Sequence, residues 1–262
     1  QQIARMTKSM DPLGIFYRNA EMIGDRFELY QDLKMVDSLY KPRQLFIDEI
    51  NAVGDWERTI KALSDEGFFD DKSAILTGSS SLNIMKKAER LPGRLAEGQN
   101  KYRYYPLSFG EVAKIYGIRA GTPKEALAQL EGLNSVLLRF FIHGGFISAI
   151  NTLKSAERLD ENIFSIYSAW IDGALANVKR SPETGNRILD GIANALTNEI
   201  AWNSLAKNVN HVTVSEYADV LKDMFVIGYI EKSRRAKEGA PKNKKIYFTD
   251  PFLYWLSLFK SR

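Results

Sequence analysis

Leu45-Phe46-Ile47-Asp48-Glu49-Ile50 joins a short apolar run to two adjacent carboxylates, and this pattern indicates the class of fold. Three consecutive apolar residues are typical of a parallel strand buried on both faces. Two carboxylates follow where such a strand leaves its sheet, and open α/β sheets bind ligands at that edge. A second apolar run, Ala74-Ile75-Leu76, leads into Thr77-Gly78-Ser79. The two runs therefore predict neighbouring parallel strands in an α/β fold, with acids and hydroxyls gathered at one edge.

Asp48 and Glu49 have two interpretations on spacing alone. In a nucleotide hydrolase, a carboxylate at the strand end holds Mg²⁺, its neighbour polarises the attacking water, and a hydroxyl of the adjacent strand positions that water or the γ-phosphate. In the alternative, Asp48 caps the next helix and Glu49 is a solvated acid in its first turn. The pattern leaves both open.

Length and composition indicate a globular protein without disulfides or a membrane-spanning segment. A length of 262 residues suits one large or two small domains, and 45% hydrophobic with 26% charged residues is ordinary for a globular chain. The absence of cysteine excludes disulfides and thiol chemistry, and two histidines leave little for a histidine metal site. No apolar run approaches the roughly 18 residues of a membrane span. We therefore expect a cytoplasmic protein with no membrane segment.

The positive charge is concentrated in one loop. The whole chain has a formal net charge of +4, yet the segment between Ser233 and Lys245 alone carries +5. Its basic residues are Arg234, Arg235, Lys237, Lys242, Lys244 and Lys245, against the single acid Glu238. A localised basic patch favours an anionic partner such as DNA.

The segments around the two central strands have clear periodicity. Gly14 to Arg18 predicts a strand, and Met22 to Tyr40 predicts a helix. Asp55 to Glu66 predicts an amphipathic helix, with Trp56 as a buried anchor. Aromatic residues from Tyr102 to Phe109 predict the last strand of the α/β core.

Helical periods dominate from Gly110 to about Thr197. Gly144-Gly145 interrupts them and predicts a sharp bend or a close helix contact. His143, beside this bend, has no matching ligand residue, so a packed histidine is the preferred interpretation.

The C-terminal segment predicts a winged helix-turn-helix. Thr213 and Glu216 have the spacing of a capping box for the third helix, and strands from Val226 to Lys232 and from Lys245 to Phe248 enclose the basic loop. The predicted DNA-contacting residues are Ser215, Lys222, Arg234, Arg235, Lys237, Lys242 and Lys244. The alternative is a winged helix used for packing or protein contact, because fold does not fix function.

A family resemblance rests on several motifs together. They are LFIDEI, Trp56-Glu57, Asp65-Glu66-Gly67, ILTGSSS, Gly93-Arg94, Tyr105-Pro106-Leu107-Ser108-Phe109, Gly144-Gly145-Phe146 and Ile246-Tyr247-Phe248-Thr249-Asp250-Pro251. The chain resembles archaeal and bacterial P-loop ATPases of the AAA+ class that carry a winged-helix domain after the ATPase core. The resemblance implies binding of ATP and Mg²⁺.

The same resemblance implies a role for each site residue. Asp48 is the Walker B magnesium ligand, Glu49 is the catalytic base, and Thr77 and Ser79 form the sensor hydroxyl region. Arg94 is a phosphate-sensing or finger arginine. Such arginines often act from a neighbouring subunit, which would imply a homo-oligomer.

One family motif is missing from the sequence. The P-loop, G-x-x-x-x-G-K-[ST], appears nowhere in the 262 residues, and the first residues resemble the middle of the helix that follows that loop. We therefore expect a fragment of a larger ATPase, and we expect this chain to hydrolyse ATP poorly without that loop's phosphate donors.

The expected domains are a partial ATPase core at 1–109, a helical lid at 110–186 and a winged helix at 187–262. The leading function is ATP-driven action on DNA or on a protein partner. The alternative is a non-catalytic DNA-binding or interaction protein.

Overall fold

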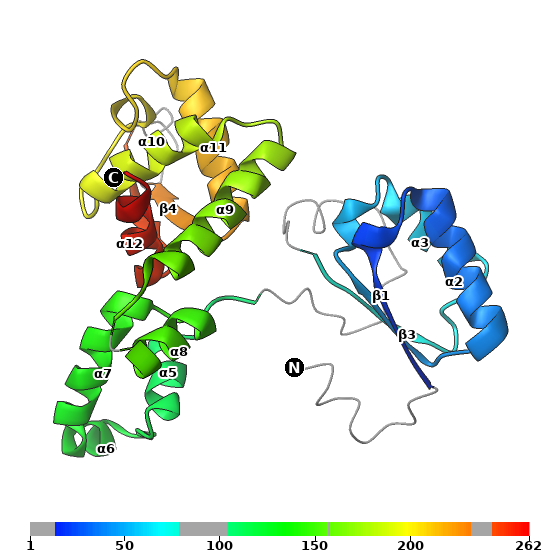
Figure 1. Cartoon of the computed structure of the whole chain (residues 1–262), viewed down its shortest axis with the longest axis horizontal. Helices are drawn as coiled ribbons and strands as arrows, with labels where there is room; N and C mark the ends of the chain where they lie inside the picture. Colours follow the sequence, from blue (N-terminus) through cyan, green and yellow to red (C-terminus); the bar gives the residue numbers. More distant parts are fainter. Residues whose placement is uncertain (1–13, 79–103, 157, 232–242, 262) are drawn as a thin grey trace, which may run out of the picture. The chain divides into compact units, whose positions relative to one another are not determined.

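The structure, a computed structural model, describes residues 14–78, 104–156, 158–231 and 243–261. The chain forms two compact units, Gln1–Arg103 and Tyr104–Arg262. The first contains a parallel sheet, and the second contains helices and a β-hairpin (Figure 1). The predicted fold class, an α/β sheet followed by helices and a winged-helix segment, is confirmed.

The sheet of the first unit has three parallel strands in the order β1-β2-β3. They are β1 (Ile15–Asn19), β2 (Gln44–Asp48) and β3 (Ser73–Leu76). Asn19 is the register partner of Asp48, and Ile47 is the partner of Leu76, so the three strands end at the same edge. Asp48, Glu49 and Thr77 follow the strands at this edge.

Two helices pack against one face of this sheet. They are α2 (Arg26–Tyr40) and α3 (Trp56–Asp65). The apolar faces of the two helices form one core with the inward side chains of β2. This core contains Leu29 and Leu33 of α2, Leu45 and Ile47 of β2, and Trp56 and Leu63 of α3. The predicted anchor role of Trp56 is confirmed, because the side chain is fully buried. The predicted start of α2 at Met22 is too early, since the Asp25 carboxylate caps the helix by accepting from the amides of Phe27 and Glu28.

The second unit begins with a helix where the sequence predicted a strand. Of the segment Tyr102 to Phe109, the described residues Tyr104–Ser108 are not in a strand, and Phe109 opens α5 (Phe109–Ile115). The reason is a capping box between Ser108 and Glu111, which satisfies free amides at the start of the helix.

The helices that follow are α6 (Pro123–Ala128), α7 (Leu130–His143), α8 (Ile147–Ala156) and α9 (Glu161–Asn177). The predicted bend at Gly144-Gly145 is confirmed, because α7 and α8 turn by 114° there. Among the described residues no single helix is long and apolar enough to cross a membrane, and only the bent pair α7 and α8 passes that test by length and composition.

The C-terminal segment has the winged-helix order of elements. It contains α10 (Pro182–Asn194), the 3-10 turn η5 (Trp202–Ser204), α11 (His211–Asp223), and an antiparallel hairpin of β4 (Ile227–Glu231) and β5 (Lys244–Phe248). The predicted cap of α11 is wrong. Asn210, not Thr213, caps the helix by accepting from the Val212 amide.

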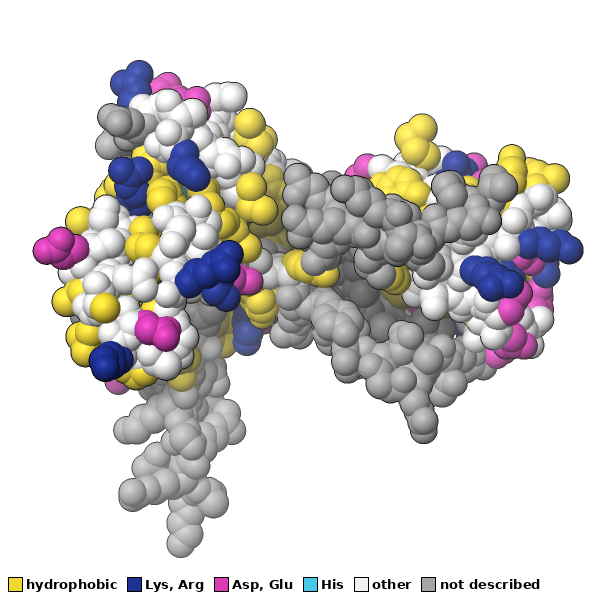
Figure 2. Space-filling view, turned by 90° about the horizontal axis from the view of Figure 1, so that it is seen from below, with side chains coloured by type: hydrophobic (Ala, Val, Ile, Leu, Met, Phe, Trp, Pro, Cys, Tyr) yellow, Lys and Arg dark blue, Asp and Glu magenta, His cyan; other side chains and the backbone are white. Residues whose placement is uncertain are grey.

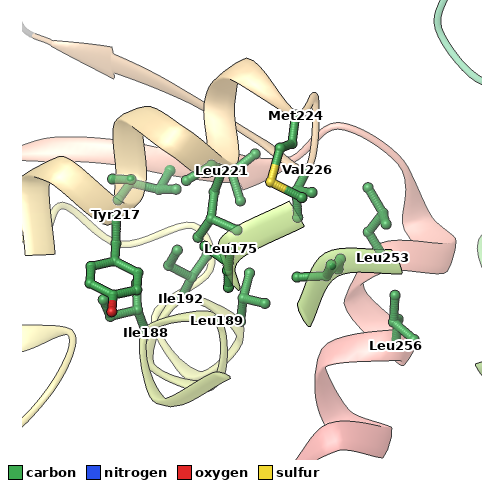
Figure 3. Packing of buried hydrophobic residues seen from close by; sticks show 14 of the residues in the cluster. Leu175, Ile188, Leu189, Ile192, Tyr217, Leu221, Met224, Val226, Leu253 and Leu256 are labelled. Carbon is green, nitrogen blue, oxygen red and sulfur yellow. The ribbon is translucent and has the colours of Figure 1, made fainter. Parts of the chain in front are cut away.

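One core joins the winged-helix elements to the helix before them. Leu175 of α9 lies in the same buried cluster as Ile188 of α10, Leu221 of α11 and Leu253 of α12 (Pro251–Lys260). Figure 3 shows these side chains directed toward one another. The predicted division of this unit at residues 186 and 187 lies within α10 and stays a prediction about folding units.

Candidate functional site

The carboxyl edge of the sheet brings two predicted residues into contact. The amide of Thr77 donates to the Ile47 carbonyl at 2.9 Å, and the amide of Ile50 donates to the Thr77 carbonyl at 2.9 Å. These backbone bonds hold the ends of β2 and β3 side by side. The Thr77 hydroxyl consequently donates a hydrogen bond to the Asp48 carboxylate.

Tyr17 is a member of this site that sequence reasoning missed. Its phenolic O–H donates to the second carboxylate oxygen of Asp48 at 2.8 Å. Tyr17 lies two residues before Asn19, the register partner of Asp48, so the two side chains share a face of the sheet. The signal that could have found it is this parallel register, which no local pattern in the sequence contains.

The hydrogen bonds decide the charge of Asp48. The Thr77 hydroxyl, and then the Tyr17 hydroxyl, hold the pKa of the Asp48 carboxyl below its ordinary value. The hydrogen bond to Asp48 raises the pKa of Tyr17, and the negative charges of Asp48, Glu21 and Glu49 add to that effect. Asp48 is therefore an ionised acceptor at neutral pH, and Tyr17 remains a protonated donor.

Glu49 follows Asp48 in a left-handed backbone conformation. Its φ is 51° and its ψ is 41°, a region that costs a non-glycine residue roughly 1 kcal/mol or more. It occupies the N-cap position of the 3-10 turn η4 (Ile50–Ala52) and makes no side-chain cap bond. Strain of this kind concentrates at functional sites, because the surrounding structure must enforce it.

The helix-capping interpretation of Asp48 is wrong for this structure. The residue at the cap of the following turn is Glu49, and the Asp48 carboxylate accepts from Tyr17 and Thr77 instead. The ionised carboxylate at the end of β2 therefore does not cap a helix.

The residues at this edge fit a magnesium site with few protein ligands. Among the described residues no group of three or more metal-ligating side chains lies together. Mg²⁺ usually keeps several waters and binds one or two carboxylates together with phosphate oxygens. Asp48 fits that pattern, since it is ionised and its carboxylate has more acceptor positions than the two hydroxyls and the Glu49 amide fill.

Several predicted site residues lie outside the described part of the chain. They are Ser79 and Arg94 of the nucleotide site, and Arg234, Arg235, Lys237 and Lys242 of the basic loop. Their roles stay predictions.

In the winged-helix segment, Glu216, Asp219 and Lys222 of α11 have partners within the chain. The Lys222 ammonium lies 4.2 Å from the centre of the Tyr229 ring, and the Tyr229 hydroxyl donates to Asp219 at 2.8 Å. Glu216 forms an ion pair with Arg180 at 2.9 Å. Ser215 is half-buried on the same helix. A contact of Lys222 with DNA would compete with its contact to the Tyr229 ring.

The predicted DNA contact by Lys244 has to be corrected. Its side chain is only 6% exposed, and its ammonium lies 4.2 Å from the centre of the Trp202 ring. Strand alternation is the physical reason, because Lys244 and Ile246 point into the core while Lys245 and Tyr247 point outward. Lys245, which was counted in the loop but was not among the predicted contacts, is the exposed lysine of β5.

On the face shown in Figure 2, Lys and Arg side chains are interspersed with Asp and Glu side chains rather than gathered in one patch. The described residues on that face therefore offer no large surface of a single charge for a polyanion.

The comparisons with known proteins identify two regions of the chain. Residues 1–113 match the family model described as an AAA domain, and residues 135–260 match a domain of unknown function, DUF8612. Residues 1–113 thus match an AAA domain, and the resemblance drawn from the motifs is confirmed for that part of the chain.

One curated relative is the uncharacterized protein MJ1544 of Methanocaldococcus jannaschii. It is 27% identical over 232 residues, which make up 87% of this chain and 46% of that protein. The chain thus spans about half the length of this relative. Among solved structures, the chain is similar to the Aeropyrum pernix Orc1 protein in complex with DNA. That match has 15% identity and a TM-score of 0.38, and it covers 95% of this chain and 77% of the other.

Proposed function

We propose that this chain is part of a magnesium-dependent ATPase that couples the state of a bound nucleotide to a winged-helix module. The observation that carries the proposal is the ionised Asp48 carboxylate, held by Thr77 and Tyr17 at the carboxyl edge of a parallel sheet. Open α/β sheets bind ligands at that edge. The AAA domain match over residues 1–113 supports nucleotide binding in general.

Each residue of the edge has a chemical role in the proposal. Asp48 would hold Mg²⁺, which when bound neutralises charge on the phosphates. Glu49 would orient the attacking water and take a proton from it. Asp48 stays ionised beside it because the hydroxyls of Tyr17 and Thr77 donate to its carboxylate. Thr77 fixes the Asp48 side chain and lies at the edge where the γ-phosphate would sit.

The partner of the winged-helix module is proposed to be DNA. The support is the basic segment from Ser233 to Lys245, whose net charge is +5, or +4 without the buried Lys244, and the exposed Lys245 at its end. Contacts of this kind go to phosphates and give affinity with little sequence information. The acidic side chains of α11 do not favour reading of bases by that helix.

The alternative is a protein-binding module. It is favoured by the pairing of Glu216 with Arg180 and of Asp219 with Tyr229, because these contacts occupy polar groups that would otherwise face DNA.

The test is calorimetry and phosphate release on the complete gene product that contains this chain. We expect Asp48→Asn to lose the magnesium-dependent part of the ATP affinity. We expect Glu49→Gln to bind ATP but to turn it over about 10² to 10⁴ times more slowly, the usual contribution of a general base.

Asp71→Asn is the matched control. Asp71 is an exposed carboxylate of the same unit, two residues before β3 and hence at the opposite end of that strand. It should change neither quantity. Magnesium-dependent affinity and turnover that stay at the wild-type level in Asp48→Asn would refute the proposal.

A further inference from the structure

Three motifs that the nucleotide site does not use meet in the second unit. They are Tyr105-Pro106-Leu107-Ser108-Phe109, Gly144-Gly145-Phe146 and Thr249-Asp250-Pro251. The amide of Leu107 donates to the Gly145 carbonyl at 3.0 Å, and the amide of Gly145 donates to the Asp250 carboxylate at 2.7 Å. A two-residue glycine corner thus links residues that are far apart in the sequence.

The corner accepts only glycine. Gly144 has a φ of 57°, and a Cβ there would overlap the Asp250 carboxylate. A Cβ at Gly145 would overlap the backbone of Leu107. The close approach of the three segments is therefore specified by the sequence.

Asp250 connects the corner to the wing. Its side chain is 4% exposed, and its second oxygen caps α12 by accepting from the Phe252 amide at 2.8 Å. The preceding residue, Thr249, follows β5 directly and donates from its hydroxyl to the carbonyl of Phe225, just after α11. A displacement of the glycine corner would consequently move the residues at which α11, the β4–β5 hairpin and α12 meet.

Tyr105 makes a second and direct contact with that meeting point. Its ring packs edge-to-face on Phe225, with the ring centres 5.0 Å apart. Phe225 itself has a φ of 58°, so the chain turns sharply there between α11 and β4. Tyr105 therefore contacts the winged-helix segment directly, and Leu107 is linked to it through Gly145 and Asp250.

The AAA domain match extends into the segment that makes these contacts. The AAA domain match runs to residue 113, yet Tyr104 and the residues after it belong to the second compact unit. The end of the AAA sequence is therefore built into the packing of the C-terminal module.

We infer that the joint formed by Tyr105, Leu107, Gly145, Asp250 and Phe225 is the element that transmits the nucleotide state of the AAA domain to the winged helix. The inference rests on the proposed function. Tyr105 is a positioning residue in it, since it touches neither nucleotide nor DNA and acts through Phe225. The linking device is the short segment Tyr104–Ser108, which contacts the winged-helix segment directly through Tyr105 and indirectly, by way of Gly145 and Asp250, through Leu107.

The test compares DNA affinity with and without ATP in the complete gene product. In the wild type we expect ATP to change the Kd for duplex DNA by about five-fold or more, the lower end of typical coupling between sites. In Tyr105→Ala we expect the change to fall to about two-fold or less, while the separate affinities for ATP and for DNA stay as in the wild type. Tyr105 is 54% exposed, so loss of its ring should leave the fold intact.

Two further variants make the result specific. Phe225→Leu removes the same ring contact from the other side and should give the same loss of coupling. Tyr40→Ala removes a tyrosine that is 63% exposed at the end of α2, and it should keep the wild-type coupling. Hydrogen exchange supplies an independent readout, and ATP should alter the protection of the Leu107 amide in the wild type but not in Tyr105→Ala.

The outcomes separate the two proposals. Undiminished coupling in both Tyr105→Ala and Phe225→Leu would overturn the joint and leave the proposed function standing. A wild-type protein whose DNA affinity ignores ATP would overturn the proposed function, and the joint with it.

Discussion

The substitution Asp250→Asn should change how the stability of the second unit depends on pH. Burial raises the pKa of Asp250 from an ordinary 3.8 to about 6, although the amides of Gly145 and Phe252 act in the opposite direction. A raised pKa means that the native state holds the proton more tightly than the unfolded chain does. The stability from this group is then fully present below about pH 3.8 and is lost as the pH rises through about 6.

The magnitude follows from the two pKa values. At about 1.36 kcal/mol per pKa unit, ionisation of the buried carboxyl costs about 3 kcal/mol of unfolding free energy between acid and neutral pH. The asparagine side chain of the variant stays neutral throughout. The wild type should therefore lose about 3 kcal/mol relative to Asp250→Asn as the pH rises from about 4 to about 7.

The assay is urea unfolding followed by tryptophan fluorescence. Trp170, Trp202 and Trp255 lie in the second unit, so the signal reports mainly on it. Burial also lowers the pKa of His143, so its contribution to stability is lost as the pH falls. That contribution is common to both proteins and cancels in their difference. A stability difference between the two proteins that does not vary with pH would show that the pKa of Asp250 is not raised in the native state.

Three further predictions concern the site, the wing and the core. Tyr17→Phe removes a donor from Asp48, so the pKa of Asp48 should rise toward its ordinary value in a carbon-13 titration of the carboxyl, and an unchanged pKa would contradict the hydrogen bond. Lys245→Ala should reduce the salt slope of DNA binding by about one, as measured by binding at several salt concentrations. Lys244→Ala should leave that slope unchanged, but it should lower the free energy of unfolding in urea by about 1 kcal/mol because the contact with the Trp202 ring is lost. Leu175→Ala should cost about 2 to 5 kcal/mol of unfolding free energy in urea, because the fully buried side chain leaves a cavity, and a loss below about 1 kcal/mol would show that the core is not packed as described.

Much of the fold could be predicted because local patterns and tertiary packing agree. The apolar run before Asp48 and the helical period around Trp56 each give the element that the structure contains. The glycine pair at Gly144-Gly145 likewise signalled a bend, since no other residue fits there. In these stretches local sequence preference is sufficient.

Other features depend on partners that are distant in the sequence. Thr213 and Glu216 have the spacing of a capping box, but Asn210 begins the helix earlier and Glu216 pairs with Arg180. Lys244 counts as one more charge in a basic loop until strand alternation turns it toward Trp202. Such outcomes depend on which side chain reaches a partner first, and spacing does not contain that information.

The candidate site shows the same division. The edge position of Asp48 and Thr77 followed from two strand ends, and the structure brings these residues into contact. Tyr17 could not be found in this way, because its approach to Asp48 requires the register between β1 and β2.

The most direct measurement of the central claim is paramagnetic broadening by Mn²⁺, used in place of Mg²⁺, in the presence of ATP. On the complete gene product, we expect the amide signals of Glu49, Thr77 and Gly78 to broaden more strongly than those of Lys72 and Ser73 at the other end of β3. In Asp48→Asn the broadening should be lost. Sharp signals at Thr77 and Gly78 in the wild type, under conditions where ATP is bound, would contradict a metal and nucleotide site at this edge of the sheet.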